Sequence, residues 1–235
     1  MKKTIGTLQD KDKNSNTLHI EDSYALTIGF EIIDFEKNFI DLGNLYGNTD
    51  KYHYAVKSPG HTFIYLSYNN EITSFFSLGP EASNNGNNGS YLKKMHGKGT
   101  PDYWISDDVY LFRFHLEPDE YIKLLEKITR ERESILNGEK YYRVVGNHTC
   151  ASAARDIITS IWSNFPKGES KIVLIGDREG IEFVYPISVV NPYAFYNDLV
   201  KGGYKYRKID SNINMWDLII RGEDRNDPYI NTGEK

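Results

Sequence analysis

The chain has a single cysteine, Cys150, and no long apolar run in its 235 residues. One cysteine cannot form an internal disulfide, and it excludes a cysteine-rich zinc site. No window approaches the roughly 18 to 20 consecutive apolar residues that a membrane-spanning helix needs, and the first residues lack the apolar stretch of a signal peptide. We therefore expect no transmembrane segment and a cytoplasmic location in the producing cell.

Basic clusters are also absent from the chain, whose formal net charge is -5. Nucleic acids are bound through clustered lysine and arginine side chains, so no nucleic-acid partner is expected. The sequence has no phosphate-cradling glycine loop and no pair of histidines at metal-ligand spacing, and we expect neither a cofactor nor a metal ion. Hydrophobic residues make up 39% and aromatic residues 14%, which excludes wholesale disorder.

Runs rich in β-branched and aromatic residues predict the strands. The clearest single strands are 24–33 and 109–116. Two hairpins are predicted, one from 60–68 and 71–78 joined by Asn69-Asn70, and one from 171–175 and 181–185. The polar stretch from residue 83 to about 100 predicts a long mobile loop.

Capping residues predict three helices. Pro118 opens an amphipathic helix that ends near residue 137, and Asn191-Pro192 opens a short one that ends near residue 202. Between them, Thr149 is placed to cap a helix that begins at Cys150. One face of that helix carries Cys150, Ala154, Ile157 and Ile161.

This order of elements predicts an α+β fold in which an antiparallel sheet packs against the helix that bears the cysteine. The chain has no internal repeat and no linker, so we expect one domain over residues 17–222. Polar residues at both ends predict a flexible N-terminus over 1–16 and a flexible C-terminal tail over 223–235.

A thiol in the first turn of a helix is suited to nucleophilic catalysis. The partial positive charge of the helix end favours the nucleophilic thiolate, and unpaired backbone N–H groups there can stabilise an oxyanion. A free cysteine is also among the most buried residue types and often only fills space. The position of Cys150 therefore allows a catalytic or a structural role.

A cysteine nucleophile needs a base, and the chain has six histidines. They are His19, His53, His61, His96, His115 and His148. His61 begins a strand directly after Ser58-Pro-Gly60, where glycine lets a ligand or another segment approach closely. His148 lies two residues from Cys150, which favours a role in shaping the turn. His61 is our candidate base, although a histidine in a strand is often structural.

Two segments resemble the circularly permuted branch of the papain-like, NlpC-type cysteine hydrolases. They are Gly60-His-Thr-Phe-Ile-Tyr-Leu66 and Tyr142-Arg-Val-Val-Gly-Asn-His-Thr-Cys-Ala-Ser-Ala153. In that branch a histidine at the start of a strand precedes a cysteine that begins a helix. The resemblance covers roughly residues 55–200, including Pro186-Ile-Ser-Val-Val-Asn-Pro192. It implies a papain-like fold with Cys150 as nucleophile and His61 as general base.

Many members of this branch carry a third polar group, which holds the imidazole, on the strand after the histidine. If the predicted hairpin turns about Asn70, His61 lies across from Gly79, and Ser77 is its diagonal neighbour on the same face. A register shifted by one residue would present Ser74 and Phe76 instead. Ser77 is therefore our candidate for the third catalytic residue.

The resemblance also implies a function. We expect hydrolysis of amide or peptide bonds, with the peptide of bacterial peptidoglycan as the substrate. Some members are antibacterial toxins exported by type VI secretion without a signal peptide, and an immunity protein is the partner expected for such an effector. Other members are phospholipases and acyltransferases, so a phospholipid is the alternative substrate. A second alternative is a catalytically inactive protein that keeps the fold and binds a partner.

Overall fold

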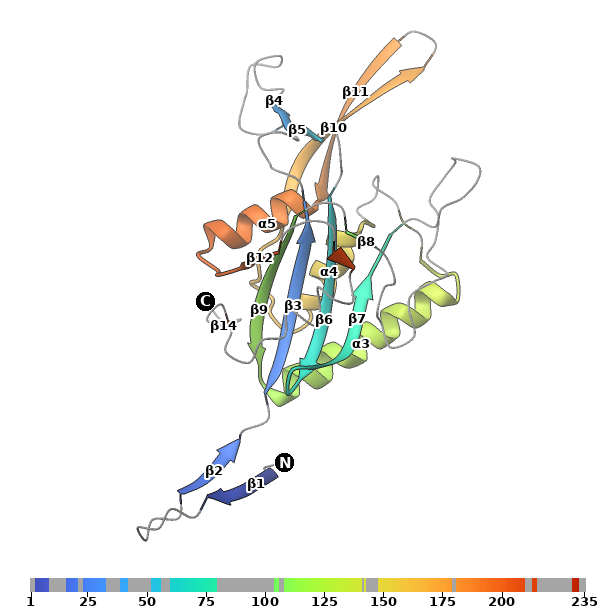
Figure 1. Ribbon diagram of the computed structural model, residues 1–235. Helices are drawn as coiled ribbons and strands as arrows, with labels where there is room; N and C mark the ends of the chain where they lie inside the picture. Colours follow the sequence, from blue (N-terminus) through green and yellow to red (C-terminus); the bar gives the residue numbers. More distant parts are fainter. Residues whose placement is uncertain are drawn as a thin grey trace.

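A six-stranded sheet with helices on one face forms the centre of the molecule (Figure 1). The computed structural model describes residues 3–8, 16–20, 23–32, 39–41, 52–55, 60–79, 104–105, 108–140, 142, 148–178, 181–209, 213–214 and 230–232. Within these residues, no helix is long and apolar enough to cross a membrane.

The central sheet is antiparallel apart from one short strand. In spatial order its strands are β12 (Arg207–Ile209), β9 (Val109–Leu116), β3 (Tyr24–Glu31), β6 (His61–Tyr68) and β7 (Glu71–Ser77). The remaining strand, β14 (Ile230–Thr232), pairs with β9 in parallel. The strand β3 lies between β6 and β9 along its whole length, and its residues are almost all buried.

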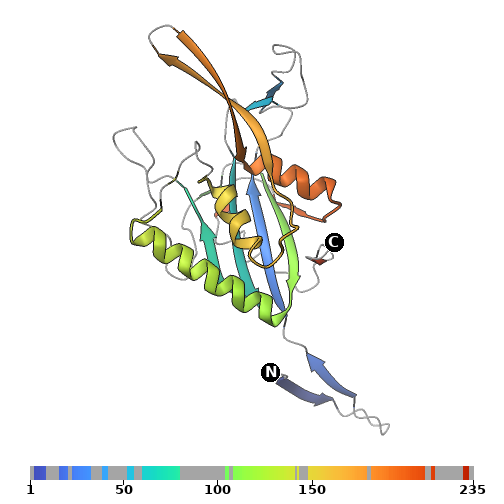
Figure 2. The same cartoon turned by 180° about the vertical axis from the view of Figure 1, so that it is seen from behind.

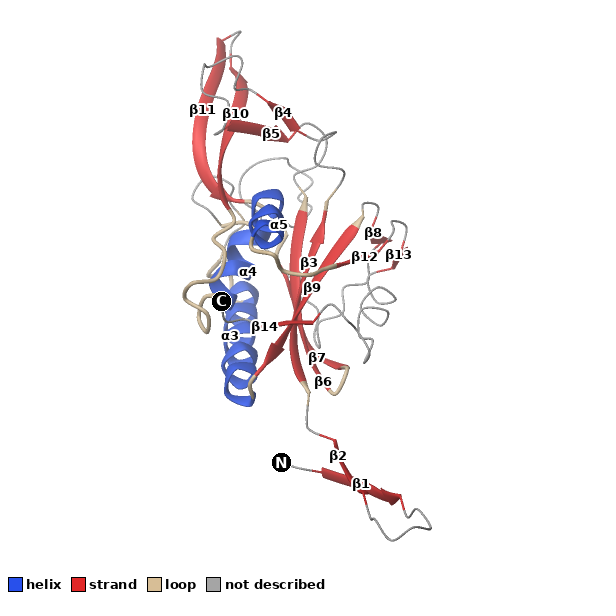
Figure 3. Ribbon diagram, turned by 90° about the vertical axis from the view of Figure 1, so that its left-hand side faces the viewer, coloured by secondary structure: helices blue, strands red, loops and turns tan. Residues whose placement is uncertain are grey.

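Three helices cover one face of this sheet (Figures 2 and 3). They are α3 (Pro118–Leu136), α4 (Cys150–Ile158) and α5 (Pro192–Lys201). Their apolar side chains pack against the even-numbered residues of the strands, such as Ile28, Ile64 and Phe112. The odd-numbered residues form a smaller cluster on the opposite face, where Phe63 and Phe75 stack. Strand alternation therefore gives the sheet two different faces.

A second sheet continues from the body of the molecule as a long hairpin (Figure 3). Its strands, in spatial order, are β11 (Ile181–Val190), β10 (Glu169–Arg178), β5 (Tyr52–Ala55) and β4 (Phe39–Asp41). Two further pairs lie within the described residues: β8 (Trp104–Ile105) with β13 (Ile213–Asn214), and β1 (Lys3–Leu8) with β2 (Asn16–Ile20).

The predicted α+β class with an antiparallel sheet is confirmed, and so are the three helices and both hairpins. Short strands are present at both chain ends, where the sequence predicted flexible segments. Lys3–Leu8, in the expected flexible N-terminus, pairs with β2, and Ile230–Thr232, in the expected tail, adds to β9. Both pairings depend on partners elsewhere in the chain, which polar composition does not reveal. The mobile loop expected from residue 83 to about 100 lies outside the described residues.

Candidate functional site

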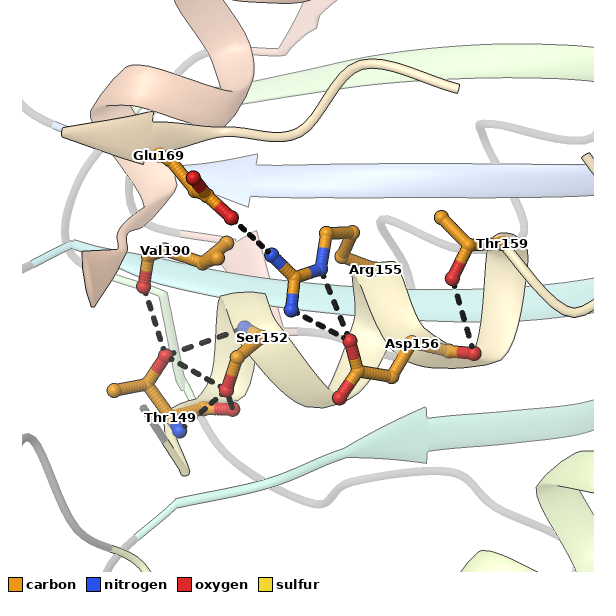
Figure 4. A network of polar contacts seen from close by, with 7 residues as sticks. All are labelled: Thr149, Ser152, Arg155, Asp156, Thr159, Glu169 and Val190. Carbon is orange, nitrogen blue, oxygen red and sulfur yellow. Dashed lines mark hydrogen bonds and ion pairs between the residues drawn. The ribbon is translucent and has the colours of Figure 1, made fainter. Parts of the chain in front are cut away.

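The start of α4 is built by a local capping network (Figure 4). The Thr149 hydroxyl accepts from the Ser152 backbone N–H at 3.2 Å, and the Ser152 hydroxyl accepts from the Thr149 N–H at 2.7 Å. This reciprocal arrangement is a capping box. The Thr149 hydroxyl also donates to the Val190 carbonyl at 3.0 Å, so the last residue of β11 holds the helix start in place.

The helix lies close to β6 because the residues that face the sheet are small. Ala151 and Ala154 are completely buried, and Ile157 and Ile158 extend the same apolar contact farther along the helix. Cys150, the first helical residue, is only 2% exposed. The predicted N-cap and the predicted position of the cysteine are therefore confirmed, and the thiol lies inside the protein rather than at its surface.

Several hydrogen-bond donors surround the thiol. The backbone N–H groups of Thr62 and Ala151, the N–H of Cys150 itself and the Tyr142 hydroxyl each lower the pKa of this thiol, but burial outweighs them and raises it overall. The Thr62 contact brings the helix start next to the first residues of β6. Tyr142, in turn, has its pKa raised by burial and by the nearby sulfur. At neutral pH the site therefore contains a protonated thiol.

The structure also brings His61 and Ser77 together. The Nε2 atom of His61 lies 2.7 Å from the Ser77 hydroxyl oxygen, which is hydrogen-bond distance. Phe63 pairs with Ser77, so His61 at the start of β6 is diagonal to Ser77 on the same face. Gly60, which precedes His61, has a positive φ of 68° and leaves no room for a β-carbon beside the Tyr193 ring. This glycine fixes how the chain enters β6.

A β-bulge makes this diagonal contact possible. The turn residues Asn69 and Asn70 both have positive φ, as a two-residue hairpin turn requires. Next to the turn Ser67 pairs with Ile72, but the following pair is Leu66 with Ser74, so Thr73 is an extra residue in β7. Beyond the bulge the register is the one that places Ser77 beside His61.

Burial lowers the pKa of His61 from 6.5 to about 4, since a partly buried imidazole is costly to charge. The ring is therefore neutral at pH 7. A neutral imidazole can accept a proton, but the same lowered pKa makes the ring a weaker base in this position than a free imidazole. Its contact with Ser77 occupies Nε2, the ring nitrogen farther from the backbone.

The thiol and the imidazole approach β6 from different faces. Strand alternation places the His61 side chain with Phe63, on the face away from the helices, whereas Cys150 begins a helix that covers the other face. The donors that lower the pKa of the thiol include the N–H of Thr62, and the His61 imidazole is not among them. The structure thus brings His61 to Ser77 and Cys150 to Thr62.

Two residues at this site were not singled out by sequence reasoning. Tyr142 begins the segment that carries the resemblance, but nothing in the sequence indicates that its hydroxyl reaches Cys150. Thr62 follows His61, and its hydroxyl is buried with no hydrogen-bond partner within the described part of the chain. Strand alternation predicts that Thr62 faces away from His61, and only the helix position reveals the contact with Cys150.

Comparisons with protein-family models, with curated proteins and with solved structures give no match for this chain. Among the described residues, no group of three or more histidine, cysteine or acidic side chains is placed to hold a metal ion. The chemistry of this site therefore has to be argued from its own geometry.

Proposed function

We propose that the protein is a cysteine hydrolase with a papain-like arrangement, in which Cys150 is the nucleophile and His61 the general base. The observation that carries the proposal is the contact between the Cys150 thiol and the Thr62 N–H. This contact places the Cys150 thiol, at the start of α4, beside Thr62, the residue that follows the neutral His61. Almost ninety positions of sequence separate the two. The resemblance in the sequence assigns the same pair of residues.

The proposed reaction begins with two neutral partners. His61 takes the proton of the thiol while sulfur attacks the acyl carbon, and the Cys150 N–H and Tyr142 hydroxyl donate to the developing oxyanion. The protonated imidazole then gives its proton to the leaving amine or alcohol. Water attacks the thioester as His61 accepts its proton. The acid is released, and the imidazolium returns that proton to the departing Cys150 thiolate.

The proposal requires a movement of the imidazole. His61 is the first residue of β6, and β7 ends at Ser77, so within the described residues neither strand extends past this pair. In this proposal, rotation of the His61 side chain away from Ser77 turns its ring toward the sulfur. Ser77 is then the residue that returns the ring to its resting position, as a positioning residue rather than a proton donor.

The substrate we favour is a peptide or amide bond of bacterial peptidoglycan, as expected for an exported antibacterial effector. An ester bond of a phospholipid is the alternative because the same nucleophile and base cleave both. The two are separated by incubating the protein with muropeptides and with phospholipid vesicles and analysing both by mass spectrometry.

A second candidate is a protein that keeps this fold but only binds a partner. The burial of Cys150, the raised pKa of its thiol and the opposite faces of thiol and imidazole favour it. A structural cysteine has these properties.

Substitution of Cys150 by alanine tests the first candidate against the second. We expect turnover to fall by about 10⁴-fold or more in Cys150→Ala, as when a nucleophile is removed from other hydrolases. His61→Gln should lose activity similarly, while His115→Gln, an exposed histidine of the same sheet, should keep it. Unchanged turnover in Cys150→Ala would refute the nucleophile. No turnover by the wild type on either substrate, with the thiol unreactive toward iodoacetamide at pH 7, would favour the binding protein.

A further inference from the structure

The register of β7 is poorly specified by its hydrophobic pattern. The central residues Ser74-Phe75-Phe76-Ser77 read the same in both directions. A slip of one residue exchanges the faces of the two phenylalanines, so each face of the sheet still receives one aromatic ring and one serine. Burial of these four side chains therefore contributes little to the choice between the two registers. The next residue, Leu78, is buried in the core beneath the helices, and its burial favours the native register.

The hairpin turn favours the register that separates Ser77 from His61. Tyr68 pairs with Glu71 and Ser67 with Ile72 across the two-residue turn. If this ladder continued without interruption, Phe63 would pair with Phe76 and Ser77 would turn toward the helices. An extra residue between the turn and Ser77 is needed to return Ser77 to the face that carries His61.

Two hydrogen bonds hold that extra residue, Thr73, in place. Its hydroxyl donates to the Leu66 carbonyl at 3.2 Å, on the strand opposite the bulge. The same oxygen accepts from the Tyr121 hydroxyl of α3 at 2.7 Å. The Tyr121 ring is anchored in turn, because it is 9% exposed and packs 4.8 Å from the Tyr24 ring.

We propose that Thr73 and Tyr121 are positioning residues that select the register in which Ser77 contacts His61. The Tyr121 hydroxyl of α3 stabilises the bulge at Thr73 by its hydrogen bond. The position of the bulge in turn determines which face of the sheet Ser77 occupies. The catalytic consequence of this selection rests on the proposed hydrolase function, whereas the selection of register does not. Neither residue touches the substrate in this proposal.

The test removes the two hydrogen bonds while keeping side-chain shape. In Tyr121→Phe combined with Thr73→Val, we expect the ratio of native to slipped register to fall roughly tenfold. Nuclear Overhauser contacts between backbone protons report it: Phe63 contacts Ser77 in the native register and Phe76 in the slipped one. If turnover is measurable, kcat should fall with the native fraction while KM stays constant.

Deletion of Thr73 provides a rescue that a merely structural role would not predict. Without the extra residue, a regular ladder from the same turn pairs Phe63 with Ser77, so Tyr121→Phe should then have no effect on register. Tyr24→Phe is the matched control, since its ring packs against Tyr121 in a tilted arrangement and the change should leave the register native. The two single variants are measured in the same way if the double variant does not fold.

The proposal would be overturned if the folded double or single variants showed only the Phe63–Ser77 contact of the native register and no Phe63–Phe76 contact. The proposed function can fail separately: a Cys150→Ala protein with unchanged turnover refutes the nucleophile but leaves the register measurement intact.

Discussion

The two faces of the central sheet are built differently. On the helix-covered face, rings from strands and helices interlock, as in the cluster of Phe114, Trp162, Phe165 and Tyr204. The opposite face has a small apolar cluster around Phe63, together with buried polar side chains such as Thr27 and Arg113. Apolar burial is the main favourable term in folding, so the helix-covered face supplies most of the stability.

The difference also separates the candidate functional groups. His61 and Ser77 lie on the face opposite the helices, which we call the polar face. Cys150 lies at the margin of the helix-covered face. The Arg113 guanidinium reaches the turn residue Asn70 at 2.9 Å, so polar contacts on this face connect β9 to the β6–β7 hairpin. A sheet with one tightly packed face can carry polar groups on the other without losing its core.

The largest expected effect tests whether the helix-covered face dominates stability. Phe114 is completely buried among three other rings, and Phe114→Ala should lower the free energy of unfolding by about 3–5 kcal/mol. Phe75→Ala on the opposite face should cost less, because the ring contacts it loses there are mainly those with Phe63. Urea unfolding followed by circular dichroism measures both, and equal losses would contradict the comparison.

A pH effect is expected from the polar face. Burial lowers the pKa of His61 from 6.5 to about 4, so between these values the unfolded state binds a proton that the native state does not. Stability is therefore complete above pH 6.5 and falls on acidification to pH 4, by at most about 3 kcal/mol given the partial exposure of the ring. His61→Gln should remove this dependence and His115→Gln should not. A wild-type stability that is constant from pH 6.5 to 4 would show that the imidazole is not held neutral.

An intermediate effect is expected at Gly29, the point of closest approach to the Phe63 ring on the face away from the helices. A β-carbon added at Gly29 would lie 2.1 Å from the Phe63 ring, so Gly29→Ala should cost about 1–3 kcal/mol by overpacking. In a Phe63→Leu background the same change should cost less, because the ring edge is gone. A double-mutant cycle in urea measures this coupling, and strictly additive losses would mean that the two positions do not meet.

The smallest effect is expected at the start of α4. Thr149→Ala removes the cap and the contact with Val190, and should lower the free energy of unfolding by about 1 kcal/mol. Thr149→Ser keeps the hydroxyl and should lose less. Because the helix start shields Cys150, iodoacetamide should label the thiol faster in Thr149→Ala than in either Thr149→Ser or the wild type. Identical labelling rates in the three proteins would show that the Thr149 cap does not shield the Cys150 thiol.

Local signals predicted much of this fold. The Asn69-Asn70 turn was predictable because asparagine tolerates positive φ, and the start of α4 because Thr149 stands before an apolar helical face. The strand 109–116 was predicted at its observed limits. The pairings of β1 and β14 were missed because pairing depends on a partner strand rather than on local composition.

The candidate site was predictable only in part. Ser77 was reached by assuming a regular hairpin about Asn70, whereas the structure reaches the same pairing through a tighter turn followed by a bulge at Thr73. Thr73 at the bulge accepts a hydrogen bond from Tyr121, nearly fifty positions away, and no local pattern contains that information. The role of Tyr142 beside the thiol was missed for the same reason.

The sequence by itself determined where helices begin, where the hairpins turn and that the only thiol starts a helix, because caps, turns and alternation act over a few neighbouring residues. Only the tertiary structure decided the register beyond the bulge, the burial of the thiol and the face on which each candidate residue lies. These depend on how α3 and α4 pack on the sheet, and packing joins residues that the chain keeps far apart.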